Sequence, residues 1–235
     1  MNLAQVYPNV RQHLENWSGY HTLADALKLF PDLEVFLAGG VVRNCLLEAS
    51  LPPKDFDFFL RGPSVKQAIT HFAGRGTLET TPYGAPRWHP FERGEQYADL
   101  MSIEGFVPGL WQCEDIVDVL NQFDFTANAL AFNVRTGASF DPQNGVRDTL
   151  RRTMRMVRFD YPERPFISQA TLSRNAVLWF RILHYAAALN FAIEPFTLEW
   201  LQTHRTFGLH EEEFRSLFFL PHPLYLEPLN VKSRE

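Results

Sequence analysis

Cysteine is scarce in this 235-residue chain, which carries two, Cys45 and Cys113, far apart in the sequence. Neither has a second cysteine or a histidine nearby at the spacing typical of a zinc site. Two separate cysteines also cannot form the disulfide framework of a small secreted domain, so we expect two reduced, buried thiols. The scarcity of cysteine therefore argues against zinc-finger and disulfide-stapled proteins.

Long apolar segments are missing too, since no run approaches the roughly 20 residues that a membrane-spanning helix requires. The segment that begins at Met1 does not combine a basic start with an apolar stretch, so it lacks the pattern of a secretion signal. These two absences predict a soluble, cytoplasmic protein with no membrane partner.

An excess of basic charge is the third absence, because 22 Lys and Arg residues are outnumbered by 27 Asp and Glu residues and the net charge is -5. Such a chain has no overall positive field that would attract nucleic acid without sequence preference. Any RNA must therefore be held by a local basic patch. The hydrophobic content of 46%, in contrast, is enough for a substantial core.

A glycine pair follows the first strand-like segment of the chain. Residues 35–38 form a short apolar run that ends at Gly39 and Gly40, and residues 41–47 resume with helical spacing. A helix that starts directly after glycines offers free backbone N–H groups and a favourable dipole to a phosphate. Arg43, one turn into the helix, is placed to add a forked contact. An ordinary strand-to-helix turn would explain the glycines equally well.

Carboxylates recur in two alternating segments further along. In residues 55–60, Asp55 and Asp57 face one side of the predicted strand, and only apolar residues face the other side. Residues 96–103 form a second alternating strand that carries Asp99. Paired carboxylates, completed by a third from a neighbouring strand, suit magnesium, which prefers oxygen ligands. A solvated strand face is the alternative, but the apolar neighbours favour a central strand.

The remaining patterns predict an α/β (α+β) fold, with a mixed sheet flanked by helices over residues 1–160 and a short helical region over residues 161–235. Further strands are expected at residues 77–81 and within 128–141, the latter as two strands joined at 135–137. Helices are expected within residues 3–30 and at 64–73, 114–121, 146–157 and 172–189, the last ending at Asn190. The Pro- and Gly-rich stretch after residue 81 is expected to be a loop.

Basic residues recur at intervals of three and four near the middle of the chain: Arg147, Arg151, Arg152, Arg155 and Arg158. On the helix predicted there, this spacing would produce one cationic edge that contacts RNA phosphates. A solvated helix face that pairs with acidic residues is the alternative.

Several segments, taken in order, resemble the head domain of the class II poly(A) polymerases and CCA-adding tRNA nucleotidyltransferases. Residues 37–44 (LAGGVVRN) and 52–57 (PPKDFD) are similar to the family's Gly-Gly-x-Val-Arg-Asp and Lys-Asp-x-Asp elements. Residues 124–131 (DFTANALA) and 141–150 (DPQNGVRDTL) are similar to two later boxes, and residues 181–191 to the first neck helix. The resemblance implies a nucleotidyltransferase head over residues 1–160 and a truncated helical neck with a C-terminal tail over residues 161–235.

The resemblance also implies roles for individual residues. Asp55 and Asp57 would bind Mg2+ in a two-metal site, with Asp99 as the third catalytic carboxylate. Asp124 would order the junction between head and neck. The residues implied in binding the NTP are Gly39, Gly40, Arg43, Asn128 and Arg181.

The chain departs from the family pattern mainly at positions that recognise the nucleotide. The substituted positions are Asn44 for an Asp, Gln122 and Phe123 for two arginines, and Arg174, Asn175 and Leu178 within the Glu-Asp-x-x-Arg motif that reads the base. The sequence also ends at Glu235, before the body and tail helices with which the family holds tRNA.

The predicted function is magnesium-dependent transfer of a nucleoside monophosphate from an NTP to an acceptor hydroxyl, with an RNA 3' end as the first candidate acceptor. Two alternatives stay open. One is the same transfer to a protein or a small molecule, which the acidic composition favours. The other is a non-catalytic relic that binds a nucleotide or RNA, which the substituted base-reading positions favour. The sequence leaves the oligomeric state open.

Overall fold

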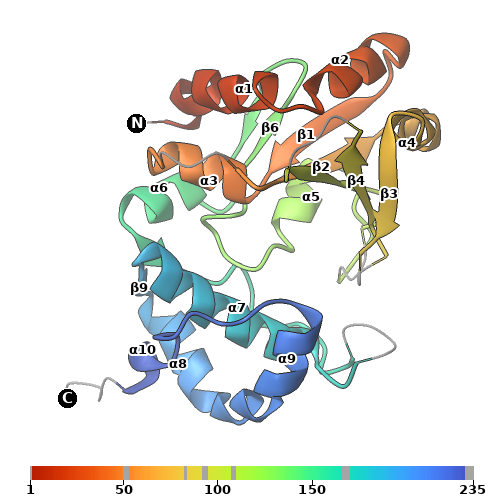
Figure 1. Ribbon diagram of the computed structural model, residues 1–235. Helices are drawn as coiled ribbons and strands as arrows, with labels where there is room; N and C mark the ends of the chain where they lie inside the picture. Colours follow the sequence, from red (N-terminus) through yellow and green to blue (C-terminus); the bar gives the residue numbers. More distant parts are fainter. Residues whose placement is uncertain are drawn as a thin grey trace.

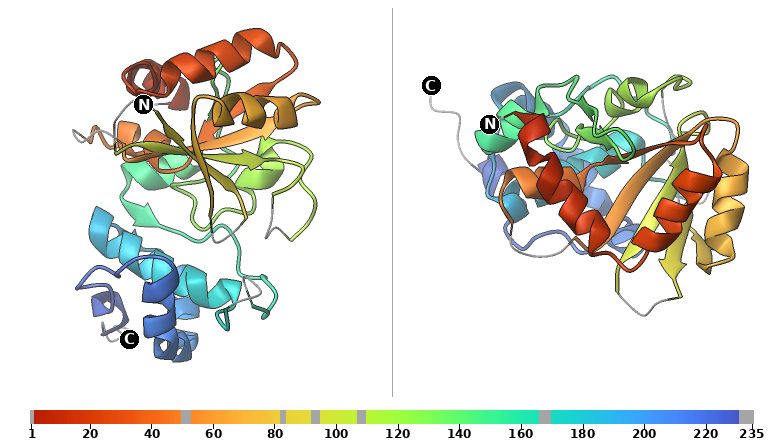
Figure 2. Two further views of the ribbon diagram at one scale, coloured as in Figure 1. Left: turned by 45° about the vertical axis from the view of Figure 1, so that its right-hand side comes forward. Right: turned by 90° about the horizontal axis from the view of Figure 1, so that it is seen from above.

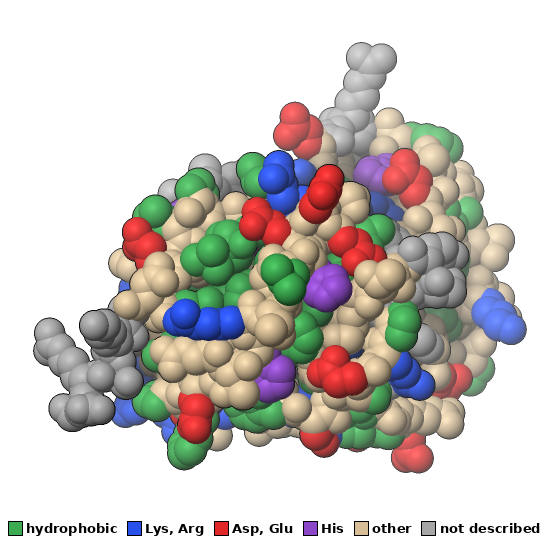
Figure 3. All heavy atoms as spheres, turned by 90° about the horizontal axis from the view of Figure 1, so that it is seen from below, with side chains coloured by type: hydrophobic (Ala, Val, Ile, Leu, Met, Phe, Trp, Pro, Cys, Tyr) green, Lys and Arg blue, Asp and Glu red, His purple; other side chains and the backbone are tan. Residues whose placement is uncertain are grey.

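A mixed sheet with its helices lies above a group of C-terminal helices in the computed structural model (Figure 1). The structure describes residues 2–49, 53–81, 84–91, 95–106, 110–165 and 170–230; Met1, Glu235 and the first residue of the 52–57 segment lie outside these ranges. The two parts keep this stacked arrangement in side view (Figure 2). Hydrophobic, acidic and basic side chains intermingle on the face seen from below (Figure 3). No helix among the described residues is long and apolar enough to cross a membrane.

The upper part, which we call the head, holds the main sheet. Its helical elements are η1 (Leu3–Val6), α1 (Tyr7–Glu15), α2 (Tyr20–Leu29), α3 (Gly40–Leu46), α4 (Val65–Ala73), α5 (Ile116–Leu120) and α6 (Gly145–Leu150). Its strands are β1 (Glu34–Ala38), β2 (Asp55–Arg61), β3 (Gly76–Thr80), β4 (Pro86–Pro90), β5 (Tyr97–Ser102), β6 (Ala131–Asn133) and β7 (Ser139–Phe140). Within the described ranges the strand order is β3-β4-β5-β2-β1-β6-β7, and only β2 and β5 pair in parallel. The predicted mixed α/β sheet is confirmed.

The lower part, which we call the neck, contains the helices that follow α6. Its elements are β8 (Thr153–Met154), α7 (Arg174–Leu189), β9 (Ala192–Ile193), α8 (Pro195–Thr203), η2 (Arg205–His210), α9 (Glu211–Leu217) and α10 (Glu227–Asn230). The Ser173 side chain caps the start of α7, and Asn190 ends it in the left-handed conformation at φ 53°, as predicted. Phe180 of α7 stacks on Phe214 of α9 with ring centroids 4.6 Å apart. Phe125, which belongs to the predicted head of residues 1–160, is buried in the same cluster as the neck helices.

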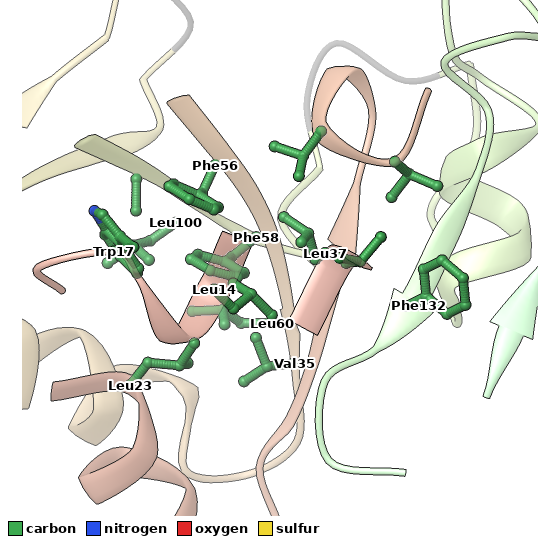
Figure 4. Close-up of a cluster of buried hydrophobic side chains, with 14 of the residues drawn as sticks. Leu14, Trp17, Leu23, Val35, Leu37, Phe56, Phe58, Leu60, Leu100 and Phe132 are labelled. Atoms are coloured by element: carbon green, nitrogen blue, oxygen red, sulfur yellow. The ribbon is translucent and has the colours of Figure 1, made fainter. Parts of the chain in front are cut away.

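Strand β2 is covered on both faces, which explains its apolar composition. Phe56, Phe58 and Leu60 pack into a core with the helices that precede β1 (Figure 4). Trp17 stacks on Phe56 there, with ring centroids 4.7 Å apart. Phe59 belongs to a separate buried cluster with residues of α5, on the opposite face. The predicted central strand is therefore confirmed, and its carboxylates lie at the end of a rigid element.

Two predictions about elements are wrong. The stretch after residue 81 contains strand β4, which pairs with β3 and β5 although it begins and ends with proline. The helix predicted over residues 146–157 stops at Leu150, because the chain turns at Arg152 with φ 50° and continues as β8, which pairs with β9. Charged residues at helical spacing do not by themselves create the buried face that sustains a helix.

Candidate functional site

The turn between β1 and α3 brings backbone against a carboxylate. Gly39 adopts φ 77° and ψ -137°, a conformation that side chains rarely tolerate. A Cβ atom placed on Gly39 would lie 2.8 Å from Oδ2 of Asp57. The Gly39 N–H donates to the carbonyl of Leu130 at 3.2 Å, which ties the turn to the segment before β6. Glycine is therefore required here both for the backbone angle and for the space beside Asp57.

The strand register places the three predicted carboxylates near one another. Asp57 of β2 lies opposite Ala38 of β1 on one side and Asp99 of β5 on the other. Asp55 lies two residues before Asp57, opposite Tyr97. Because side chains alternate along a strand, Asp55 and Asp57 point to the face opposite Phe56 and Phe58, which is the face that Phe59 also occupies.

Burial and mutual repulsion disfavour the charged carboxylates. Burial, followed by repulsion from Asp55 and Asp99, raises the pKa of Asp57 to about 8. Burial and then the charge of Asp99 also raise the pKa of Asp55. Asp57 is half-buried and Asp55 is exposed, so the upward shift of the pKa is stronger at Asp57, where repulsion from two neighbours adds to burial. A bound cation would offset both costs.

Asp99 is engaged by an arginine that the sequence patterns did not single out. Arg87 of β4 donates to its two oxygens, from Nε at 2.7 Å and from Nη2 at 2.9 Å. Within the described part of the chain, no group of three or more His, Cys, Asp or Glu residues is arranged to hold a metal ion. The structure therefore brings Asp99 beside Asp57 as expected, but pairs it with Arg87. The alternation around buried Trp88 is a sequence signal for strand β4, but the prolines at both ends of the segment favour a loop instead.

Asp55 and Asp57 by themselves fit a divalent cation. Both offer carboxylate oxygens from one face of one strand, which is the donor chemistry that magnesium prefers. The missing side chain at Gly39 leaves room beside Oδ2 of Asp57, where a Cβ would intrude. The fit therefore rests on donor type and on space.

Arg43 lies buried at the inner side of the glycine turn. Its Nη1 donates to Oδ1 of Asn128, and its Nε and Nη2 donate to Oδ1 of Asn44 at 3.1 and 2.9 Å. Burial lowers its pKa, although the ring of Tyr185 faces the guanidinium at 5.6 Å. Asn44, which replaces an Asp of the family pattern, thus still accepts hydrogen bonds from this arginine.

The same network continues into the neck through Asp124. Its Oδ2 accepts from Nε and Nη2 of Arg181 on α7 at 3.0 and 2.6 Å, and its Oδ1 accepts from Nδ2 of Asn128 at 3.4 Å. Tyr185, one turn after Arg181, also faces that guanidinium at 5.3 Å. Asp124 thus binds two of the predicted nucleotide-binding residues, Asn128 and Arg181, and the third, Arg43, joins them through Asn128.

The substituted residues before Asp124 and at the start of α7 make internal contacts. Gln122 is fully buried, and its side chain holds the 110–113 segment by accepting from the Leu110 N–H and donating to the Trp111 carbonyl at 3.2 Å. Arg174 donates to the Gln122 carbonyl at 2.8 Å and faces the ring of Tyr161 at 4.4 Å. These positions therefore stabilise the region between head and neck.

The basic residues expected along one helix edge are distributed differently. Arg147 and Arg155 both bind Asp148, with the closest contacts at 3.2 and 2.8 Å. Arg158 binds Asp160 at 2.6 Å. Only Arg147 lies within α6, while Arg151, Arg155 and Arg158 follow it. The predicted cationic helix edge is wrong, because the helix ends before most of its arginines.

Comparison with known proteins gives relatives of one kind, although no protein-family model matches the chain. A "Multifunctional CCA protein" of Xanthomonas axonopodis pv. citri is 31% identical over 167 residues, which cover 67% of this chain and 39% of that protein. A "CCA-adding enzyme" of Actinobacillus succinogenes is 28% identical over 183 residues, covering 75% and 42%. The chain thus spans about two fifths of the length of the curated relatives it matches.

Solved structures share the fold. A tRNA nucleotidyltransferase complexed with a primer tRNA and an incoming ATP analog superposes with a TM-score of 0.57 and 23% identity, covering 81% of this chain and 52% of that one. A CCA-adding enzyme in complex with CTP gives a TM-score of 0.61 with 19% identity, covering 87% and 45%. At this level of identity the structures show a shared fold over most of the chain.

Proposed function

We propose that this chain, which belongs over its head and neck to the family of CCA-adding tRNA nucleotidyltransferases and class II poly(A) polymerases, transfers a nucleoside monophosphate from an NTP to an acceptor hydroxyl. The observation that carries the proposal is the approach of Gly39 to Asp57, where a Cβ atom would lie 2.8 Å from the carboxylate. It joins the two elements such a transfer needs, a phosphate-binding turn and paired metal ligands.

Asp55 and Asp57 would hold Mg2+ on the face of β2 that borders the turn. The chemistry supplied there by bound magnesium is neutralisation of phosphate charge and activation of the attacking hydroxyl, shared between two ions in a two-metal site. Asp99, the third predicted carboxylate, lies next to Asp57 in the sheet with both oxygens bound to Arg87, so it would stand beside the metal ligands without holding the ion. Without a cation, the close carboxylates repel each other, so the protein's own contribution is to hold them in place before the metal binds.

The triphosphate would lie against the turn formed by Gly39 and Gly40, with the N–H of Gly40 as a donor, because the N–H of Gly39 is already bound to the Leu130 carbonyl. Arg43 would add positive charge there, oriented by Asn128 through the hydrogen bond between their side chains. Arg181 would reach the nucleotide from the neck, since Asp124 holds it close to the same network. In this arrangement head and neck bind one nucleotide together.

The acceptor we favour is an RNA 3' end of the tRNA type, because relatives are named for adding CCA and a structural neighbour contains a primer tRNA. Arg147 of α6 and Arg151, Arg155 and Arg158 of the segment after it would contact RNA as separate residues. A different acceptor, such as a protein or a small molecule, is the second candidate. The net charge of -5 favours it, because such a chain attracts RNA weakly.

Transfer of label tests the proposal. Wild type, Asp55→Asn and Asp57→Asn are incubated with each α-labelled NTP and magnesium, separately with tRNA lacking its 3' CCA, with protein and with no acceptor. We expect labelled RNA from wild type and a loss of at least roughly a hundredfold in either variant. The matched control is Asp25→Asn on α2, an acid with a side chain 48% exposed, which we expect to keep full activity. Equal labelling by wild type and variants, or NTP binding without any transfer, would contradict the enzymatic function.

A further inference from the structure

An arginine and a carboxylate form a closed pair next to the proposed metal ligands. Asp99 accepts two hydrogen bonds from Arg87, one at each oxygen, at 2.7 and 2.9 Å. The Tyr97 ring lies 4.1 Å from the guanidinium carbon and supports it from one side. The Asp99 side chain is only 15% exposed. The pair therefore has better geometry and less solvent than an ordinary surface ion pair.

Strand register puts this pair in contact with the site. Asp99 on β5 lies opposite Arg87 of β4 and also opposite Asp57 of β2. The same carboxylate thus stands between a cation on one side and a proposed metal ligand on the other. Arg87 satisfies both of its oxygens, in agreement with the lack of a three-residue metal cluster within the described ranges.

We infer that Arg87 is a positioning residue which neutralises Asp99 and so leaves the divalent cation to Asp55 and Asp57. The inference deepens the proposed function and rests on it. With both members present, the pair adds no net charge, and the cation meets two carboxylates. Removal of one member leaves an unbalanced charge beside Asp57, and the sign of that charge determines whether a cation binds more tightly or more weakly.

The test is a double-mutant cycle read by Mn2+ binding to the whole chain, in calorimetric titrations without nucleotide. Arg87→Gln frees an anion beside the site, so we expect Mn2+ to bind on the order of tenfold more tightly. Asp99→Asn leaves an unpaired cation, so we expect binding on the order of tenfold weaker. The double variant should return to within about threefold of wild type, since it again adds no charge.

A direct metal ligand would behave differently in the same cycle. If Asp99 binds the ion, Asp99→Asn and the double variant bind Mn2+ equally weakly. Arg87→Gln then shows no gain in Mn2+ affinity. Either result overturns the inference. Tighter binding by Arg87→Gln is informative because general damage to the fold does not produce it.

A matched ion pair on the same sheet serves as the control. Arg61 at the far end of β2 binds Glu34 of β1 at 3.2 Å, and both side chains are exposed. Arg61→Gln, Glu34→Gln and their double variant change charge equally, and we expect Mn2+ affinity to change by less than about twofold because solvent screens the distant charge. Changes as large as those at Arg87 would attribute the effect to total charge and refute a local role.

Folding is checked by thermal melting of each variant without metal. If Arg87→Gln alone does not fold, the comparison of Asp99→Asn with the Arg87→Gln/Asp99→Asn variant remains decisive, because the inference predicts that only Asp99→Asn binds weakly, whereas a direct ligand leaves both weak. Arg87→Lys keeps the charge without the fork, and we expect it to bind within about threefold of wild type. If Arg87→Lys binds Mn2+ as weakly as Asp99→Asn, the inference fails.

Failure of the inference can be told from failure of the proposed function with two further variants. Asp55→Asn and Asp57→Asn should lose Mn2+ binding in either case. If both bind Mn2+ like wild type, the metal site is elsewhere and the proposed function fails. If both lose Mn2+ while the double variant of Arg87 and Asp99 stays as weak as Asp99→Asn, only the role of Arg87 is refuted.

Discussion

Gly39 combines a backbone conformation that other residues rarely adopt with a position next to a proposed metal ligand. Gly39→Ala forces a side chain into φ 77° and puts its Cβ 2.8 Å from Oδ2 of Asp57. We expect the free energy of unfolding to fall by about 2–3 kcal/mol, as measured by chemical denaturation, because backbone strain and a close contact add. Mn2+ affinity should fall as well, since Asp57 has to move.

Gly84 is the control for this prediction, because it has φ 79° and nothing within 4 Å of the position of a Cβ. Gly84→Ala should cost only the backbone strain, about 1 kcal/mol, and leave Mn2+ affinity unchanged. Equal effects of the two substitutions would show that the contact with Asp57 has no importance.

The pKa of Asp57 predicts how stability depends on pH. A carboxyl whose pKa is raised by folding, here to about 8, binds more protons in the folded state than in the unfolded state between those two values. The free energy of unfolding contributed by Asp57 therefore falls as pH rises through this window. Without metal, we expect the melting temperature to drop by about 3–6 °C between about pH 5 and about pH 8.

Two measurements separate Asp57 from other titrating groups. Asp57→Asn should lose most of the decline, because an amide does not titrate. Saturating Mg2+ should reduce it in wild type, since a cation replaces the proton that stabilises the pair. If the variant shows the same decline as wild type, the raised pKa of Asp57 is not its cause.

At the scale of elements, patterns with a single dominant cause were predictable from sequence. The run 35–38, the glycine turn and the alternation at 55–60 each match an element, because burial on a fixed period decides the structure. Strand β4 was not predictable, since its pairing with β3 and β5 compensates for prolines at both ends. The role of Arg87 was not predictable either, because its partner Asp99 lies on another strand. Contacts across strands and between head and neck depend on tertiary structure that no local pattern records.

The attachment of α7 to the head depends on Asp124, which binds Arg181 through two hydrogen bonds. Asp124→Asn removes the negative charge that binds Arg181 and weakens the hydrogen bonds that Arg181 donates to this side chain. We expect the free energy of unfolding to fall by about 1–3 kcal/mol, because the carboxylate is buried and its hydrogen bonds are charge-assisted. Protection from hydrogen exchange should fall in α7 and at Asn128, while the sheet keeps its protection.

Asp160→Asn is the comparison at this scale. Asp160 also makes two hydrogen bonds to one arginine, Arg158, but its side chain is 66% exposed. We expect a change below about 1 kcal/mol, because water replaces the lost contact. A loss as large as that of Asp124→Asn would mean that the joint between head and neck is no more important than a surface ion pair.

At the scale of the whole molecule, a chain with a net charge of -5 has to bind an anionic partner if RNA is the acceptor. Three arginines of the segment after residue 145 already bind carboxylates: Arg147, Arg155 and Arg158. Acidic and basic side chains are also scattered among one another on the face seen from below (Figure 3). Few phosphate contacts are therefore expected from this part of the molecule, and shape and the nucleotide site would have to select the acceptor.

The salt dependence of RNA binding measures this directly. Each phosphate neutralised on a single strand adds about -0.7 to the slope of log K against log salt. With about two such contacts, we expect a slope no steeper than about -2 for a hairpin with a single-stranded 3' end, measured by fluorescence anisotropy. Arg151→Gln, which alters a basic residue outside the three ion pairs above, should make the slope shallower by about 0.7 if it contacts RNA. A slope steeper than about -4 would instead require an extended basic surface. It would contradict the expectation that this chain contacts only a few phosphates.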